Sequence, residues 1–121
     1  MGALRAGSAV REITPQESQF LFGYPHVERY STGVHDPLLS SALYLSDGKE
    51  EVLIIANDII FVSKKSTAII RKRICDKISI SEKNILISAT HTHSGPKTMD
   101  YISNEADDIV PKADTQYVQY M

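Results

Sequence analysis

The alternation of apolar and polar positions along the chain predicts four β-strands. Strand is predicted at residues 4–13, 39–45 and 52–56, and again in the aliphatic run 85–90. The Ser-Asp-Gly sequence at 46–48 is a turn signal that joins the second and third strands as a hairpin. The third strand is apolar without interruption, which is typical of a sheet covered on each side.

A helix is predicted between the third and fourth strands, over residues 63–77, with a serine as its amino-terminal cap. Ile70, Ile74 and Ile78 recur at four-residue spacing and would form its buried stripe, which leaves the basic run 71–73 to water. A strand, helix and strand in this order form a right-handed crossover with parallel strands. The predicted fold class is therefore α/β, with a mixed sheet, a β-α-β unit and helices on its faces.

Two segments lack a regular pattern. Residues 16–37 form a long irregular stretch, and loops of this length in compact domains are usually functional or disordered. Residues 97–113 are polar and acidic, and are expected to form either a lid or a surface loop. Asp114 is then placed to cap a helix carrying Tyr117 and Tyr120. A helix of under two turns is not stable alone, so we expect a fold that is incomplete at its C-terminus.

Length and composition narrow the class of protein. With 121 residues, 42% hydrophobic and 23% charged, the chain suits one globular domain, and a net charge of −2 argues against binding to nucleic acid. The single cysteine, Cys75, excludes an internal disulfide and a cysteine-based zinc cluster. No apolar run predicts a transmembrane segment or a signal peptide. The expected location is cytoplasmic as written, and secreted or periplasmic if a leader is missing.

Two histidines after the last predicted strand are the strongest chemical signal. His91 and His93 are two residues apart, and side chains at this spacing share one face of a strand. Gly95 and Pro96 are expected to end the strand, because proline cannot donate to a ladder. Both imidazoles would then lie at the carboxyl edge of the sheet, where open α/β sheets bind ligands. Because imidazole is a common metal ligand, the pattern favours a functional site over two solvated histidines.

Several motifs, in order along the chain, resemble the amino-terminal part of the neutral/alkaline non-lysosomal ceramidases. These motifs are Ala6-Gly7-x-Ala9 with Ile13-Thr14-Pro15, Gly23-Tyr24, Gly33-x-His35, a strand ending in Asp58, and Asn84-x-x-x-Ser88-Ala89-Thr90-His91-Thr92-His93-Ser94-Gly95-Pro96. The last of them is the most specific. The resemblance implies a zinc-dependent amidase that splits ceramide into a sphingoid base and a fatty acid.

The resemblance also implies roles for individual residues. His91 would be a zinc ligand, and His93 would be catalytic, in hydrogen bonding or proton transfer beside the scissile amide. Asp58 would orient an imidazole from behind the metal ligands. His35 would be either a pocket residue or a loop histidine. A catalytic zinc takes about three protein ligands and a water, so the further ligands would come from the missing C-terminal region.

Residues 1–121 are therefore predicted to be the amino-terminal part of a truncated ceramidase-like catalytic domain. The predicted substrate of the full-length enzyme is the amide of ceramide or a related N-acyl lipid. The fragment alone is expected to be inactive. Two alternatives remain open. The chain could be a non-catalytic domain or assembly subunit, whose open sheet edges need a partner such as a second copy in a homo-oligomer. It could also belong to a different metallohydrolase in which His91 and His93 are joint ligands.

Overall fold

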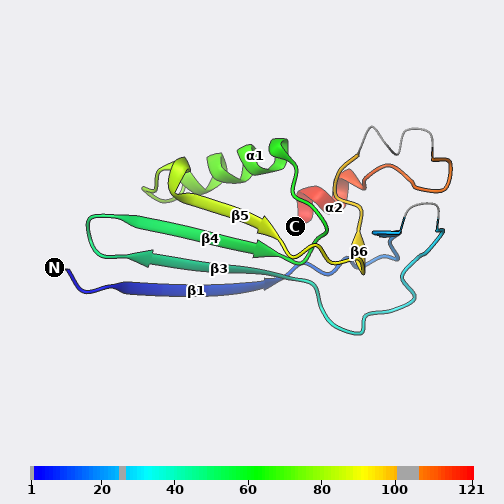
Figure 1. Cartoon of the computed structure of the whole chain (residues 1–121), viewed down its shortest axis with the longest axis horizontal. Helices are drawn as coiled ribbons and strands as arrows, with labels where there is room; N and C mark the ends of the chain where they lie inside the picture. The colour runs from blue at the N-terminus through cyan, green and yellow to red at the C-terminus, as the bar shows by residue number, and fades with distance from the viewer. Residues whose placement is uncertain (1, 25–26, 101–106) are drawn as a thin grey trace.

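The fold is seen in a computed structural model, which describes residues 2–24, 27–100 and 107–121 (Figure 1). The elements are β1 (Arg5–Glu12), β2 (Leu21–Phe22), β3 (Leu39–Ser46), β4 (Glu51–Asn57), α1 (Lys64–Cys75), a 3₁₀ turn η1 (Glu82–Asn84), β5 (Ile85–Ala89), β6 (Gly95–Pro96) and α2 (Thr115–Tyr120). The four long strands form one sheet in the order β1-β3-β4-β5, and β2 pairs with β6 in a second, two-stranded sheet. The four predicted strands and the predicted helix are all present.

The four-stranded sheet is mixed, as predicted. β3 is antiparallel to both β1 and β4, whereas β4 and β5 are parallel and are joined through α1. The β3–β4 hairpin turns at Gly48, whose φ of 88° lies in the region that favours glycine. The carboxyl ends of β4 and β5 point toward β6 and α2 (Figure 1). The α/β class with a β-α-β unit is therefore confirmed.

Helix α1 covers one face of this sheet. Ser63 caps it by accepting a 2.9 Å hydrogen bond from the amide of Ser66, as the sequence predicted. Ile70 and Ile74 pack against a cluster of buried residues that includes Ile85, which is 1% exposed. This contact is the main apolar core of the β-α-β unit.

Two details of α1 differ from the prediction. The helix ends at Cys75, so Ile78 lies beyond its last turn and is 47% exposed instead of extending the buried stripe. Arg71 is not left to water, because its Nε and Nη2 donate to the carbonyl oxygen of Ile85 at 3.1 and 2.9 Å. A long side chain can thus lie along the sheet and reach a backbone acceptor that the apolar pattern does not reveal.

The opposite face of the sheet is open. The register aligns Leu43, Ile54 and Leu86 on this face, one residue out of step with the face under α1. Leu43 is 39% exposed, Leu86 is 54% exposed, and Val10 on β1 is 65% exposed. Within the described part of the chain, the sheet is therefore covered on one side over β3, β4 and β5, and β1 is exposed along its whole length. The apolar run of β4 predicted a cover on each side.

Beyond the carboxyl edge of the sheet, loops and α2 form a second packed region. Phe20, Phe22, Ile60 and Val110 make a small buried cluster there. Tyr117 of α2 is buried, and its hydroxyl donates to the carbonyl oxygen of Ile13 at 3.0 Å. None of the helices in the described residues is long and apolar enough to cross a membrane.

Helix α2 begins where the sequence predicted. Asp114 is its N-cap, and the carboxylate accepts hydrogen bonds from the amides of Gln116 and Tyr117. The same carboxylate accepts a 3.0 Å bond from the side-chain amide of Gln19. α2 is therefore tied to the irregular segment that follows β1.

Candidate functional site

The two histidines follow β5 instead of lying within it. β5 ends at Ala89, and His91 has φ 64°, the one positive φ of a residue other than glycine in the described part of the chain. A left-handed residue breaks the strand alternation from which the shared face was predicted. The two rings nevertheless lie together, with centroids 5.0 Å apart and planes at 71°. The two rings are close together, but through the irregular segment that follows β5 and not through strand geometry.

The His91 ring is held by one nitrogen. Its Nδ1 lies 3.0 Å from the carbonyl oxygen of Ile60, and its backbone amide donates to the carbonyl of Ile59 at 3.0 Å. Because a carbonyl can only accept, this contact requires the proton on Nδ1, which in a neutral ring leaves the lone pair on Nε2. Metal-binding histidines usually donate a hydrogen bond from one ring nitrogen to a carbonyl or carboxylate and bind the metal through the other, and the His91 ring has this arrangement. The ring also forms a T-shaped pair with the ring of Phe61, with centroids 4.9 Å apart.

A single imidazole does not complete a metal site. Among the residues that the structure describes, no group of three or more histidine, cysteine, aspartate or glutamate side chains could hold a metal ion. The expectation that further ligands lie outside this chain stays a prediction. The chemistry of His91 therefore fits one ligand of a metal centre and no more.

The His93 ring lies against the backbone of Gly23. Gly23 has φ +139°, and a Cβ atom at this position would come 2.5 Å from the Cγ of His93. On another side, the ring of Tyr24 meets the imidazole with centroids 5.2 Å apart and planes at 85°. Only glycine permits this approach, for steric and for conformational reasons. Gly23 and Tyr24 are site residues that sequence reasoning missed, although their Gly-Tyr motif was part of the resemblance.

Arg29 is a second residue that the sequence analysis missed. Its Nη2 donates to the backbone carbonyl oxygen of His93, and its Cζ lies 4.6 Å from the centroid of the Tyr24 ring. Arg29 belongs to the irregular segment, where no periodic pattern distinguishes one arginine from another. No signal in the single sequence pointed to it.

A short strand pair brings these two segments together. Gly95 and Pro96 form β6 and pair with Leu21 and Phe22 of β2, in antiparallel register. The prediction that Gly95-Pro96 ends the strand was wrong in this respect, since the dipeptide is itself paired. Proline lacks only the N–H donor, and its carbonyl can still accept in a ladder of two strands that are both edges.

Asp58 lies at the end of β4 and ties two elements together. One carboxylate oxygen accepts from the amide of Leu39 at 2.9 Å, and the other accepts from the hydroxyl of Thr90 at 3.1 Å. Both oxygens are thus engaged with neighbours other than an imidazole. The predicted support of a metal ligand by Asp58 stays a prediction.

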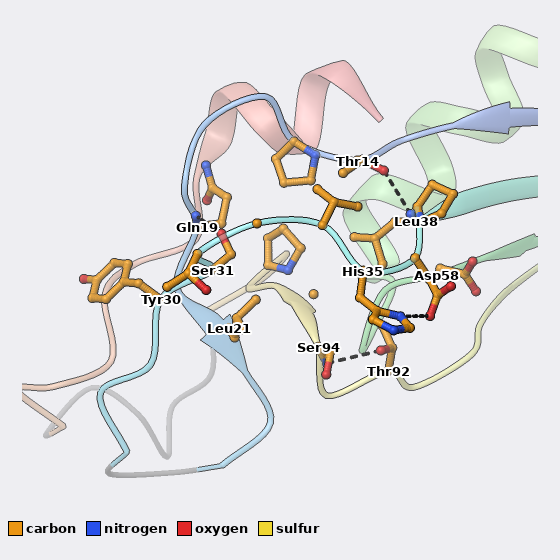
Figure 2. A pocket seen from close by; sticks show the side chains of 18 residues that line it. Thr14, Gln19, Leu21, Tyr30, Ser31, His35, Leu38, Asp58, Thr92 and Ser94 are labelled. Atoms are coloured by element: carbon orange, nitrogen blue, oxygen red, sulfur yellow. Dashed lines mark hydrogen bonds and ion pairs between the residues drawn. The ribbon is translucent and has the colours of Figure 1, made fainter.

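A pocket of about 590 Å³ lies beside the histidine segment (Figure 2). Asp58, His35, Thr92 and Ser94 line it, whereas His91 and His93 do not. The remaining lining residues are Thr14, Pro15, Gln19, Leu21, Tyr30, Ser31, Thr32, Gly33, Val34, Asp36, Pro37, Leu38, Gly95 and Pro96. The predicted site residues are therefore divided between two places. Asp58 and His35 line this pocket, whereas the rings of His91 and His93 lie together outside its lining.

His35 is the least enclosed of the four predicted residues. Its side chain is 96% exposed, and its Nδ1 lies 2.7 Å from a carboxylate oxygen of its neighbour Asp36. The structure thus places His35 on the pocket and at the surface at once, which leaves both of its predicted roles in place.

The segment after β6 is anchored on its described part. Lys97 is 6% exposed, and its Nζ donates to the carbonyl of Pro111 and to a carboxylate oxygen of Asp100, both at 2.9 Å. The Lys97 ammonium holds the pKa of Asp100 below its ordinary value. Thr98 donates to the carbonyl of Phe61 at 2.7 Å. The polar and acidic segment 97–113 was predicted as a lid or a surface loop, and residues 101–106 of it lie outside the described residues.

Comparison with known proteins gives a consistent result. The sequence model described as "Neutral/alkaline non-lysosomal ceramidase, N-terminal" matches residues 5–106. A neutral ceramidase of Mycobacterium tuberculosis (strain ATCC 25618 / H37Rv) is 29% identical over 100 residues, which cover 77% of this chain and 16% of that protein.

Solved structures show the same fold. The crystal structure of neutral ceramidase from Pseudomonas aeruginosa aligns with a TM-score of 0.69 at 20% identity, over 79% of this chain and 16% of that one. A structure described as ceramidase complexed with C2 aligns with a TM-score of 0.68 at 20% identity, with the same coverage. The chain spans about one sixth of the length of these relatives.

Proposed function

Because the chain belongs to the neutral/alkaline non-lysosomal ceramidase family, we propose that it forms the amino-terminal part of a zinc-dependent amidase. The proposed substrate is the amide of ceramide or a related N-acyl lipid. The family match over residues 5–106 carries this proposal, and the ring geometry of His91 supports the metal.

His91 is the proposed metal ligand, through Nε2. The hydrogen bond from Nδ1 to the Ile60 carbonyl would hold the ring in the tautomer that a metal needs. When bound, zinc supplies Lewis acidity, which polarises a carbonyl and lowers the pKa of a bound water to about 7. The other ligands would come from polypeptide outside residues 1–121.

His93 is the proposed catalytic partner. Its ring lies beside that of His91 and is half-buried, so a substrate amide at the metal would be within its reach. It would donate a hydrogen bond to the developing oxyanion or pass a proton to the leaving amine. The hydrogen bonds of Asp58 would hold Thr90, next to the metal ligand, in place.

A chimera tests this proposal. Residues 5–106 would replace the matching region of the Mycobacterium tuberculosis neutral ceramidase, and hydrolysis of an N-acyl sphingoid base would be measured together with the zinc content. We expect His91→Ala to abolish hydrolysis and to lower the zinc content. His93→Ala should keep the zinc and lower kcat by about a hundredfold or more.

The control and the contradicting outcomes follow from the same chimera. Arg73→Ala, on the exposed side of α1, should change neither hydrolysis nor zinc content. A folded, active chimera that tolerates His91→Ala would reject the assignment of that residue. Equal loss of zinc in both histidine variants would favour the alternative in which His91 and His93 are joint ligands.

The open face of the sheet supports a second candidate function, that of a non-catalytic binding domain. Val10, Leu43 and Leu86 are exposed there, and apolar patches of this kind mark contact with another polypeptide. Light scattering and zinc titration on the 121-residue chain separate the two candidates. A stable, metal-free oligomer would favour the binding domain, and a chain that stays monomeric would favour the enzyme fragment.

A further inference from the structure

We propose that Arg29 is a positioning residue for His93, which it holds in place through the main chain and through the ring of Tyr24. The proposal rests on the proposed function only in the role that it gives to His93. The contact itself is a property of the 121-residue chain and can be tested there.

Among the residues that the structure describes, Arg29 donates the one hydrogen bond that His93 accepts. Its Nη2 donates to the His93 carbonyl oxygen, while the guanidinium lies over the Tyr24 ring with Cζ 4.6 Å from the centroid. Tyr24 in turn meets the His93 imidazole edge-on, with centroids 5.2 Å apart. One guanidinium therefore restrains both the backbone of His93 and the neighbour against which its ring rests.

Arg29 is itself fixed to the strand pair that follows the histidines. Its carbonyl accepts a 2.7 Å hydrogen bond from the amide of Leu21, and Leu21 pairs with Pro96 in the β2–β6 ladder. Pro96 is three residues after His93. His93 is thus connected to Arg29 in two ways: directly by the hydrogen bond to its carbonyl, and indirectly through the chain to β6 and the pairing of β6 with β2.

The Nε of Arg29 adds an independent sign that this position is under constraint. This atom is buried and has no hydrogen-bond partner among the described residues. A buried, unsatisfied donor destabilises a fold, so its presence calls for an explanation. The explanation is that the planar guanidinium must both stack on Tyr24 and donate to His93, which leaves Nε without an acceptor.

A lysine at this position would restore only part of the restraint. An ammonium can donate to the His93 carbonyl, but it has no flat face to lie on the Tyr24 ring. A glutamine would lose the charge as well. The series Arg, Lys, Gln should therefore release His93 in steps, which a general loss of stability would not produce.

The experiment records the imidazole NMR signals of His93 in the 121-residue chain. The Tyr24 ring should shift these signals away from those of His35, whose side chain is 96% exposed and which serves as the internal reference. We expect Arg29→Gln to move the His93 signals most of the way to the His35 values, and Arg29→Lys to move them part of the way.

Arg71→Gln is the matched control, because Arg71 also donates from its guanidinium to a backbone carbonyl, but on α1 and β5. It should lower the stability of the chain and leave the His93 signals in place. Unchanged His93 signals in folded Arg29→Gln would overturn the proposal, as would an equal change in Arg71→Gln. If Arg29→Gln does not fold, unchanged signals in folded Arg29→Lys would overturn it.

The chimera described above then separates this proposal from the proposed function. Arg29→Lys should lower kcat by up to about a hundredfold through misplacement of His93, with KM nearly unchanged. An inactive chimera combined with the expected NMR shifts would reject the proposed function and keep the positioning role. An active chimera with unmoved signals would do the reverse.

Discussion

The β4–α1–β5 unit and the loops beyond its carboxyl edge differ in how their segments are joined. In the unit, Ile70 and Ile74 of α1 pack on buried residues of β5, so apolar burial dominates. In the loops, the segments are tied by side chains that reach backbone atoms, such as Arg29 to His93 and Thr98 to Phe61. The loops also bury apolar side chains, with Phe20, Phe22, Ile60 and Val110 in one cluster, so these hydrogen bonds act there in addition to apolar burial.

This difference explains where chemistry can reside. A packed core tolerates polar groups poorly, whereas loops that already depend on hydrogen bonds can hold an imidazole in one orientation. His91 and His93 lie in the loop region, two and four residues after the last residue of β5. The β-α-β unit therefore acts as the rigid support, and the loops beyond it form the site.

The strongest test of this comparison removes a core side chain from the unit. Ile85→Ala should lower the free energy of unfolding by about 3 kcal/mol, because Ile85 is 1% exposed and its loss leaves a cavity. Leu86→Ala, on the open face of the same strand, should cost about 0.5 kcal/mol or less. Urea unfolding measures both, and equal losses would contradict the one-sided packing of the sheet.

Gly23→Ala is expected to lower the free energy of unfolding less than Ile85→Ala does, but to displace the neighbouring His93 ring. The new Cβ would lie 2.5 Å from the Cγ of His93, at a φ that only glycine adopts readily. We expect a loss of about 2 kcal/mol and displaced His93 imidazole signals. Gly33→Ala is the control, because nothing lies within 4 Å of its Cβ position and its φ is ordinary. Unmoved His93 signals in Gly23→Ala would show that the close approach is not maintained in solution.

The smallest expected effect is a loss of stability at low pH that arises from Asp114 in the loop region. The pKa of Asp114 is held below its ordinary value by the amide of Tyr117 first, and by the Gln19 side chain next. Because the folded pKa is the lower one, this contribution to stability is present above the ordinary aspartate pKa and is lost as the pH falls through the lowered value.

The measurement is the stability of the chain to urea as the pH falls from about 5 to about 2. Asp114→Asn keeps an N-cap but cannot titrate, so its stability should change less over this range. The amide signal of Tyr117 should titrate in the unmodified chain and stay constant in the variant. A parallel titration of amides in α1 would contradict the assignment of this effect to the loop region.

The sequence predicted those parts of the fold that depend on apolar periodicity. The strands, the hairpin and the caps at Ser63 and Asp114 all follow from local patterns, and the structure confirms them. The second face of the sheet is open in the part of the chain that the structure describes, and this could not be foreseen, because the apolar pattern of β4 does not say what lies against it.

The site was predictable only in part, for a physical reason. His91 and His93 were found because two imidazoles at short spacing are rare and chemically distinctive. Arg29 and Gly23 act through contacts that span many residues of sequence, and such contacts leave no local period. The pairing of Gly95 with Phe22 was missed for the same reason.

The left-handed backbone at His91 has a consequence for anyone who would stabilise this chain. A residue with a Cβ pays about 1 kcal/mol to adopt this conformation, and glycine or asparagine would adopt it more easily. Stability-guided redesign would therefore select position 91 early and erase the candidate metal ligand in doing so. The backbone strain at His91 thus lowers the stability of the fold, and the imidazole that it carries is the group needed for the proposed function.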